Sequence, residues 1–125
     1  MKKHLKSDID ILEQKLLLIK KQEVAQIDEI ERELKQLGEN GKEENSLDTT
    51  SYSMQFENLI NSRTRLVKHL TQVNNALLRI KNNYYGNCAE TGEPIPIERL
   101  LAVPTTTLSM EGKKLKEMKN RQNFQ

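Results

Sequence analysis

A heptad pattern constrains the fold of this chain more than any other feature of its sequence. Over about four heptads, apolar side chains recur at steps of three and four, with Arg63 as the one interruption. They are Phe56, Leu59, Leu66, Leu70, Val73, Leu77, Ile80 and Tyr84. Residues that repeat every 3.5 positions form one stripe on an underwound helix, and the stripe must be buried against another helix. The pattern therefore predicts a helix over 52–83 that packs on a helical partner.

The preceding segment supplies that partner. The same rhythm runs through Leu5, Ile9, Leu12, Leu16 and Ile19, then shifts at Val24, Ile27, Ile30, Leu34 and Leu37. Glu23, Gln26 and Glu33 stand where strict heptads have apolar residues. We predict a first helix over 7–37 that ends at Gly38, and a connection over 38–51 in which Asp48 is one possible cap of the second helix. Such helices form an antiparallel hairpin.

The chain changes character after the heptads. All three prolines lie between residues 85 and 104, which predicts turns there, with short extended pieces around 95–97 rather than a helix. Residues 105–122 predict a final helix that a threonine among 105–107 caps. The predicted fold class is mainly α. A long antiparallel coiled-coil hairpin spans residues 1–84, with its tip at about 38–51, and a small C-terminal region with a terminal helix spans 85–125.

Composition excludes several classes of function. The 20 basic and 18 acidic residues give a net charge of +2, and no helix-turn-helix or basic-zipper pattern is present, so we expect no sequence-specific DNA binding. No apolar run approaches about 18 residues, so we expect no membrane span. We also expect the protein to be cytoplasmic and monomeric. Catalytic or phosphate-binding spacings are lacking, so we expect no enzyme. The single cysteine, Cys88, excludes an internal disulfide framework and an all-cysteine zinc site in one chain.

The stretch from Tyr85 to Pro104 is similar to a known family. It contains Tyr85-Gly86-x-Cys88, then Gly92-x-x-Ile95, then Arg99-Leu100-x-Ala102-x-Pro104. Together with the hairpin before it, this pattern closely resembles the DksA/TraR family of bacterial regulators that bind RNA polymerase. The resemblance covers most of the chain. It implies a coiled-coil hairpin, a finger region after it, and direct binding to bacterial RNA polymerase.

The same resemblance implies that this chain has lost the metal site of the family. The four cysteines of the family's zinc finger align here with Cys88, Thr91, Ser109 and Gly112. A structural zinc needs about four thiolate or imidazole ligands, so we expect a degenerate finger without zinc or another cofactor. We expect an apolar cluster to hold the region instead, made of Ile95, Ile97, Leu100, Leu101, Val103, Leu108, Leu115 and Met118. Cys88 is then a packed residue or, alternatively, a redox-sensing thiol.

The resemblance also implies where polymerase is contacted. Members of the family insert the hairpin into the secondary channel of the polymerase and present an Asp-x-Ala element at the tip, which aligns with Asp48 and, in place of the alanine, Thr50. Asp48 can alternatively be a helix cap alone. Arg65 matches a basic position near the polymerase rim. A second tip aspartate of some relatives aligns with Asn45.

Three basic positions through which relatives respond to guanosine tetraphosphate align with Gln72, Val103 and Lys113. Only Lys113 is basic, so it is the one candidate alarmone contact, and binding of the alarmone is doubtful because its phosphates need several cations. Lys113 can alternatively belong to a solvated helix face. The resemblance favours a regulator that modulates initiation in the stringent response. A Gre-like transcript-cleavage or elongation factor and a structural coiled-coil scaffold stay open as alternatives.

Overall fold

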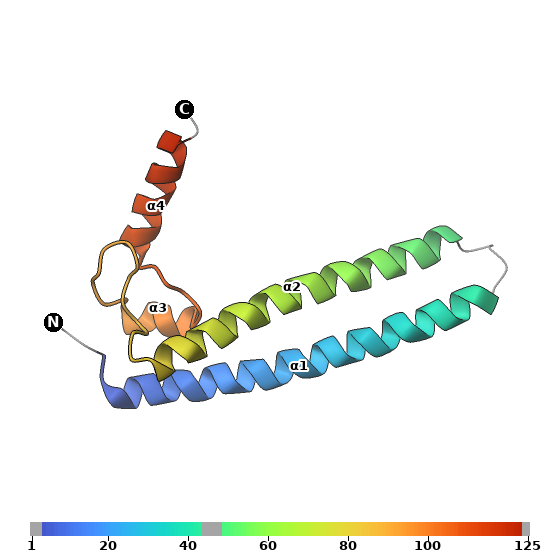
Figure 1. The fold of residues 1–125 in the computed structure, drawn as a ribbon, viewed down its shortest axis with the longest axis horizontal. Helices are drawn as coiled ribbons and strands as arrows, with labels where there is room; N and C mark the ends of the chain where they lie inside the picture. The colour runs from blue at the N-terminus through green and yellow to red at the C-terminus, as the bar shows by residue number, and fades with distance from the viewer. Residues whose placement is uncertain (1–3, 44–48, 124–125) are drawn as a thin grey trace. The chain divides into compact units, whose positions relative to one another are not determined.

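The computed structural model describes residues 4–43 and 49–123 of the chain. Within these ranges it contains helices α1 (Lys6–Glu43), α2 (Thr49–Lys81), α3 (Ile97–Ala102) and α4 (Met110–Asn123), as Figure 1 shows. The described ranges contain no strand, only one isolated bridge between Asn87 and Pro94. The mainly α fold class is thereby confirmed. By its contacts the chain falls into two compact units, which we call unit 1 (Met1–Leu18 with Gln72–Gln125) and unit 2 (Ile19–Thr71).

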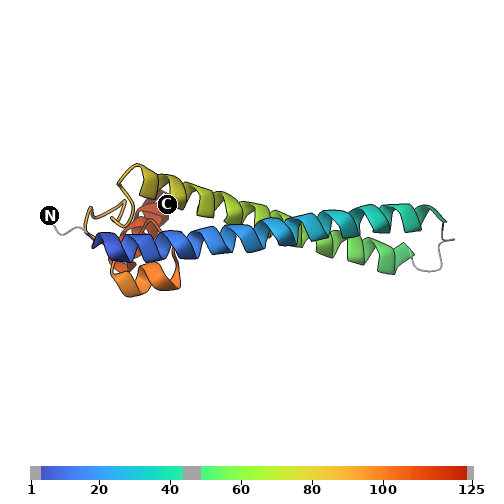
Figure 2. The ribbon, with the colours of Figure 1, turned by 90° about the horizontal axis from the view of Figure 1, so that it is seen from below.

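Unit 2 pairs the later part of α1 with the earlier part of α2. The two helices run in opposite directions, side by side in Figure 1 and crossing each other in the view of Figure 2. Their facing side chains are half-buried and come from the heptad positions that the sequence indicates, namely Ile27, Ile30, Leu34 and Leu37 on α1 and Leu59, Leu66 and Leu70 on α2. Two helices with one shared seam leave each side chain partly open to solvent, so the burial is incomplete.

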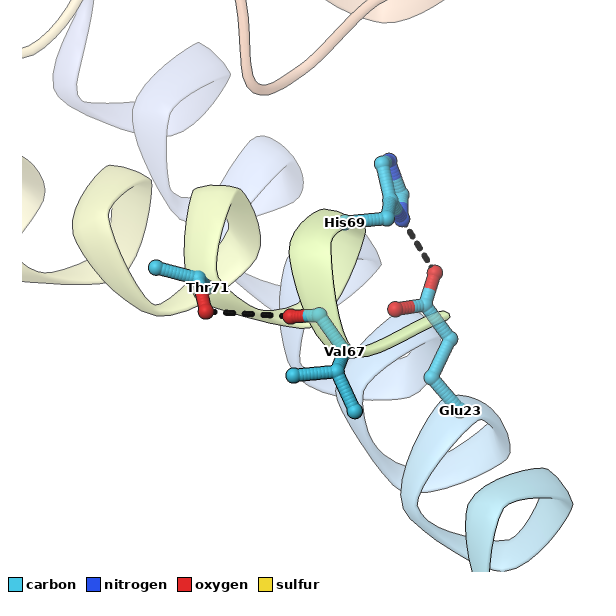
Figure 3. A network of polar contacts seen from close by, with 4 residues as sticks. All are labelled: Glu23, Val67, His69 and Thr71. Carbon is cyan, nitrogen blue, oxygen red and sulfur yellow. Dashed lines mark hydrogen bonds and ion pairs between the residues drawn. The ribbon is translucent and has the colours of Figure 1, made fainter. Parts of the chain in front are cut away.

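A polar pair interrupts this seam. Glu23 of α1 is 8% exposed, and it is the one charged residue that is buried among those the structure describes. One carboxylate oxygen of Glu23 contacts Nδ1 of His69 on α2 (Figure 3). The other oxygen, Oε2, is buried without a hydrogen-bond partner in the described part of the chain. A carboxylate removed from water is costly unless it is paired, so His69 offsets much of the cost of placing Glu23 in the seam.

This pairing predicts a non-additive effect on stability. Replacing His69→Leu leaves the Glu23 carboxylate buried without its partner, and we expect it to lower the free energy of unfolding by about 2 kcal/mol. The double replacement Glu23→Leu with His69→Leu restores an apolar seam and should bring stability back to within about 1 kcal/mol of the original chain. Urea unfolding followed by circular dichroism measures both. Equal losses in the single and double variants would contradict the pairing.

Unit 1 contains the described core. Side chains from the first part of α1, from the last part of α2 and from the chain after α2 are buried together: Leu12, Leu16, Val73, Ala76, Tyr85, Cys88, Ile95 and Leu100. Helix α3 places Leu100 in this core, while Ile95 arrives from the turn before it. His4, just before α1, contacts the carbonyl oxygen of Gly86 through Nε2 at 3.0 Å. The start of α1 is therefore tied to the turn that follows α2.

Several predicted helix boundaries are wrong. Helix α1 continues through Gly38 to Glu43, because Gly38 does not adopt the left-handed conformation that would end a helix there. Residues 97–102 form α3 instead of extended or turn structure, since Pro96 starts a run of good helix formers. Helix α4 begins at Met110 rather than near residue 105, because the cap is a serine and not one of the threonines.

The predicted apolar cluster forms only in part. Ile95 and Leu100 are buried, and Ile97 and Leu108 are half-buried. The other four members, Leu101, Val103, Leu115 and Met118, are exposed. Two of these lie on α4, so apolar packing alone does not hold that helix in unit 1. None of the described helices is long and apolar enough to cross a membrane.

Candidate functional site

The four positions that align with zinc ligands belong to one region of unit 1, which hydrogen bonds organise. Cys88 is 3% exposed, and its sulfur accepts hydrogen bonds from the backbone N–H and the hydroxyl of Ser109, each at 3.4 Å. Ser109 Oγ in turn accepts a 3.0 Å hydrogen bond from the N–H of Gly112, which is the geometry of a serine N-cap on α4. Thr91 Oγ1 accepts a hydrogen bond from the N–H of Glu93.

Gly112 is required by the position of the Cys88 sulfur. A Cβ atom on residue 112 would lie 2.2 Å from Cys88 Sγ, far inside any contact distance. The sulfur therefore occupies the space that a side chain at this position would need. We call the hydrogen-bonded group of Cys88, Ser109 and Gly112 the thiol knot.

The thiol knot also changes the acidity of the cysteine. Burial favours the neutral thiol, but hydrogen bonds from Ser109 and Thr91 outweigh it and lower the pKa of Cys88 to about 6. A sulfur that accepts several hydrogen bonds is best matched by a thiolate, so these donors favour the charged form.

These residues do not fit a structural zinc. Such a site needs four sulfur, nitrogen or carboxylate ligands, and Cys88 is the one strong ligand that the four aligned positions offer. No group of three histidine, cysteine or acidic side chains comes together anywhere in the described ranges 4–43 and 49–123. His4 comes near the region, but it is bonded to a backbone carbonyl. Hydrogen bonds to the sulfur stand where metal bonds would otherwise be.

The perturbed acidity of Cys88 predicts a pH-dependent contribution to stability. The folded pKa, about 6, lies below that of a thiol in an unfolded chain, about 8.5. The stabilisation is therefore complete above the unfolded value and is lost as the pH falls through the folded one. The difference in unfolding free energy between the original chain and Cys88→Ala should grow from pH 6 to pH 9. Urea unfolding at several pH values measures this, and a constant difference would refute a stabilised thiolate.

A second set of bonds fixes the loop between α3 and α4. The Tyr85 hydroxyl donates to the Pro104 carbonyl at 2.7 Å, and Arg79 donates to the Thr105 carbonyl at 3.2 Å. The Arg79 guanidinium also lies over the Tyr85 ring, 6.0 Å from its centre. Burial raises the pKa of Tyr85 to about 12, so its hydroxyl stays a donor at neutral pH. Arg99 donates to the Leu108 carbonyl farther along the same loop. We call the three donors, Arg79, Tyr85 and Arg99, the carbonyl clamp.

The carbonyl clamp explains two motifs of the sequence. Tyr85 and Pro104 are far apart in the chain but are bonded to each other, and each belongs to a motif that carries the family resemblance. Gly86 has a φ of 92°, a conformation that other residues rarely adopt, so glycine is favoured at this turn. Arg99 Nε donates to the Leu108 carbonyl at 2.7 Å. The motif residues thus encode a turn and a loop that hydrogen bonds within the chain hold in place.

A cavity of about 470 Å³ lies beside the clamp in unit 1. Its lining includes Gln72, Val103 and Lys113, so the three positions that the resemblance assigns to the alarmone do come together. Arg79 and Arg99 also line it, and sequence reasoning missed both. Arg99 could have been found, because it begins the Arg-Leu-x-Ala-x-Pro motif, whereas Arg79 carries no signal beyond its charge near the end of α2.

The remaining candidate residues lie elsewhere. Arg65 is an exposed residue of α2 in unit 2, where its guanidinium donates to Ser62 Oγ at 3.3 Å. Asp48 and Asn45 lie outside the described residues. Thr50 is the second residue of α2, and its side chain also lies outside the described part. The roles assigned to these residues stay predictions.

Two long paired helices, followed by a finger-like region and a capped terminal helix, place the chain in the class of coiled-coil proteins with a C-terminal finger. Residues 85–111 match the family model of the prokaryotic dksA/traR C4-type zinc finger. The fold matches the structure of transcription factor DksA2 from Pseudomonas aeruginosa, with a TM-score of 0.83 and 32% identity, over 93% of this chain and 88% of that one. The chain therefore belongs to the DksA/TraR family.

Curated relatives match over shorter stretches. The RNA polymerase-binding transcription factor DksA of Caulobacter vibrioides is 40% identical over 62 residues, which are 50% of this chain and 44% of that protein. General stress protein 16O of Bacillus subtilis is 48% identical over 42 residues, which are 34% of this chain and 26% of that protein. The chain thus spans less than half the length of these relatives in the matched segments.

Proposed function

We propose that this protein is a transcription regulator that binds bacterial RNA polymerase directly and modulates initiation. The observation that carries the proposal is the likeness to DksA2 from Pseudomonas aeruginosa, which extends over 93% of the chain. A relative that is named for binding RNA polymerase shares 40% identity over 62 residues. In this proposal the protein works as a monomer in the cytoplasm during the stringent response, and it acts through binding rather than as an enzyme or a sequence-specific DNA-binding protein.

In the proposed mechanism, the end of the hairpin between α1 and α2 enters the secondary channel of the polymerase. Asp48 acts there through its charge, beside Thr50, and Arg65 contacts acidic groups nearer the channel rim. The exposure of Arg65 supports this role, because within the described residues its guanidinium contacts the Ser62 hydroxyl and no carboxylate, whereas Arg63 on the same helix pairs with Glu31 at 3.2 Å. A charge placed close to a reaction centre alters complex lifetime with little buried area.

The alternatives are less well supported by the residues. A Gre-like factor would use adjacent tip carboxylates to hold a magnesium ion, but Asp48 is followed by Thr49. A simple scaffold would need only the heptads. It would not account for the match of residues 85–111 to the family's finger or for the clamp that the motif residues form.

The proposal predicts that binding and regulation separate along the hairpin. Arg65→Glu reverses a rim charge, and we expect affinity for polymerase to fall by about tenfold. Asp48→Asn removes the tip charge while keeping its size and capping ability, so binding should persist while the effect on promoter-complex lifetime is lost. Affinity is measured by titration of labelled protein with polymerase, and lifetime by decay of promoter complexes after competitor addition.

Lys20→Glu serves as the matched charge reversal on an exposed residue of α1, and circular dichroism verifies that all three variants fold. Failure of the original chain to bind polymerase would contradict the proposed function. An Asp48→Asn variant that regulates as the original chain does would show that this residue is wrongly assigned.

The cavity predicts a weak response to guanosine tetraphosphate. Gln72 and Val103 contribute no charge, and Arg79 and Arg99 use part of their donors on backbone carbonyls, which leaves Lys113 as the exposed cation of the lining. Each missing charge-assisted hydrogen bond costs about 1.5 to 3 kcal/mol. We therefore expect regulation in a purified transcription assay to change little when the alarmone is added. Strong synergy that disappears in Lys113→Ala would contradict this expectation.

A further inference from the structure

Helix α4 is held in unit 1 almost entirely by its first turn. Gly112 is its one buried residue among those whose side chains the structure describes, and Leu115 and Met118 are exposed. Farther along, Lys119 pairs with Glu90 at 2.9 Å, but an exposed ion pair of this kind contributes little. The position of α4 therefore depends on what holds residues 108–112.

Arg99 holds this segment on both sides of its cap. Its Nε donates to the Leu108 carbonyl at 2.7 Å, and its Nη1 contacts the Met110 sulfur at 2.9 Å. Between these two partners lies Ser109, the N-cap of α4 and a member of the thiol knot. Arg99 thus forms hydrogen bonds with the residue before the cap and with the residue after it.

Arg99 is itself firmly placed. It lies in α3, where its N–H donates to the Pro96 carbonyl at 3.0 Å, and the next residue, Leu100, is fully buried in the core. A guanidinium is planar and presents several donors in a fixed arrangement, so it reaches two separate acceptors at once. A lysine offers one point charge on a flexible stem and cannot reproduce that geometry.

The two contacts of Arg99 also affect the lining of the cavity, because they hold the segment just before Lys113. Lys113 follows the cap by one turn, with its N–H bonded to the Ser109 carbonyl at 2.9 Å, and it lines the cavity together with Gln72 and Val103. We propose that Arg99 is a positioning residue that fixes the start of α4 and thereby holds Lys113 at the cavity rim. In the same proposal the exposed Lys113 contacts acidic groups of RNA polymerase, and this part rests on the proposed function, in which the chain binds polymerase directly.

The structural part of the proposal is tested by amide hydrogen exchange. In Arg99→Lys and Arg99→Met, the Lys113 amide should exchange at least about tenfold faster, because the first turn of α4 opens more often. The amides of Cys88 and Ile95, which bond to the carbonyls of Glu93 and Gly86, should keep their rates. Lys116→Met removes an exposed cation of α4 and should change none of these rates. Unchanged exchange at Lys113, or equal acceleration at all three amides, would overturn the assignment.

The functional part is tested by a double-mutant cycle in polymerase affinity. We expect Lys113→Ala to weaken binding by about tenfold in the original chain but by less than about twofold when Arg99→Lys is already present. Additive effects, at unchanged thermal stability, would overturn the positioning role. If Lys113→Ala leaves affinity unchanged, the polymerase contact inferred here for Lys113 is wrong, and the exchange measurement alone decides whether Arg99 fixes α4.

Discussion

The C-terminal region depends on one buried sulfur that accepts hydrogen bonds. Cys88 is bonded to both donors of Ser109, and Ser109 caps α4 through Gly112, so one side chain links the turn after α2 to the last helix. In a zinc finger the metal would make this link with four ligands. Here the link is made by donors of suitable geometry, and it requires glycine at position 112 because the sulfur lies where a Cβ would be. Ser109 and Gly112 therefore fit the same sulfur, one as a donor and the other by leaving space for it.

Hydrogen bonds are more directional than apolar contacts, and this accounts for how the loop before α4 is held. The carbonyl clamp fixes the carbonyls of Pro104, Thr105 and Leu108 with donors from Tyr85, Arg79 and Arg99. Each bond specifies a position of the backbone, whereas an apolar cluster tolerates several packings of similar energy. The exposed Leu115 and Met118 contribute little to holding α4 within unit 1. Specific placement of a short, mostly exposed helix therefore comes from polar contacts at its start.

The sequence predicted the elements that periodicity determines and missed those that tertiary contacts determine. The heptads indicated α1, α2 and the seam of unit 2, and the break at Glu23 was visible, although its partner His69 was not. The helix boundaries predicted at Gly38 and around the prolines were wrong. A glycine inside a long helix costs only about 1 kcal/mol, so α1 continues through Gly38, and Pro96 precedes a short helix instead of preventing one. The aligned positions Gln72, Val103 and Lys113 do meet around one cavity. Arg79 was missed because its role depends on a carbonyl 26 residues away along the chain.

Both units contain buried polar groups, but these groups are satisfied to different extents. In unit 2 a buried carboxylate is tolerated because His69 pairs with one of its oxygens, and its second oxygen stays unpartnered in the described structure. In unit 1 each buried polar group of the clamp and the knot bonds to a donor or acceptor with ordinary geometry. Unsatisfied polar groups make a packed seam less stable, and satisfied ones make a fold more specific. The paired helices are therefore locally weakened at Glu23, while the region that carries the family motif is specified by its hydrogen bonds.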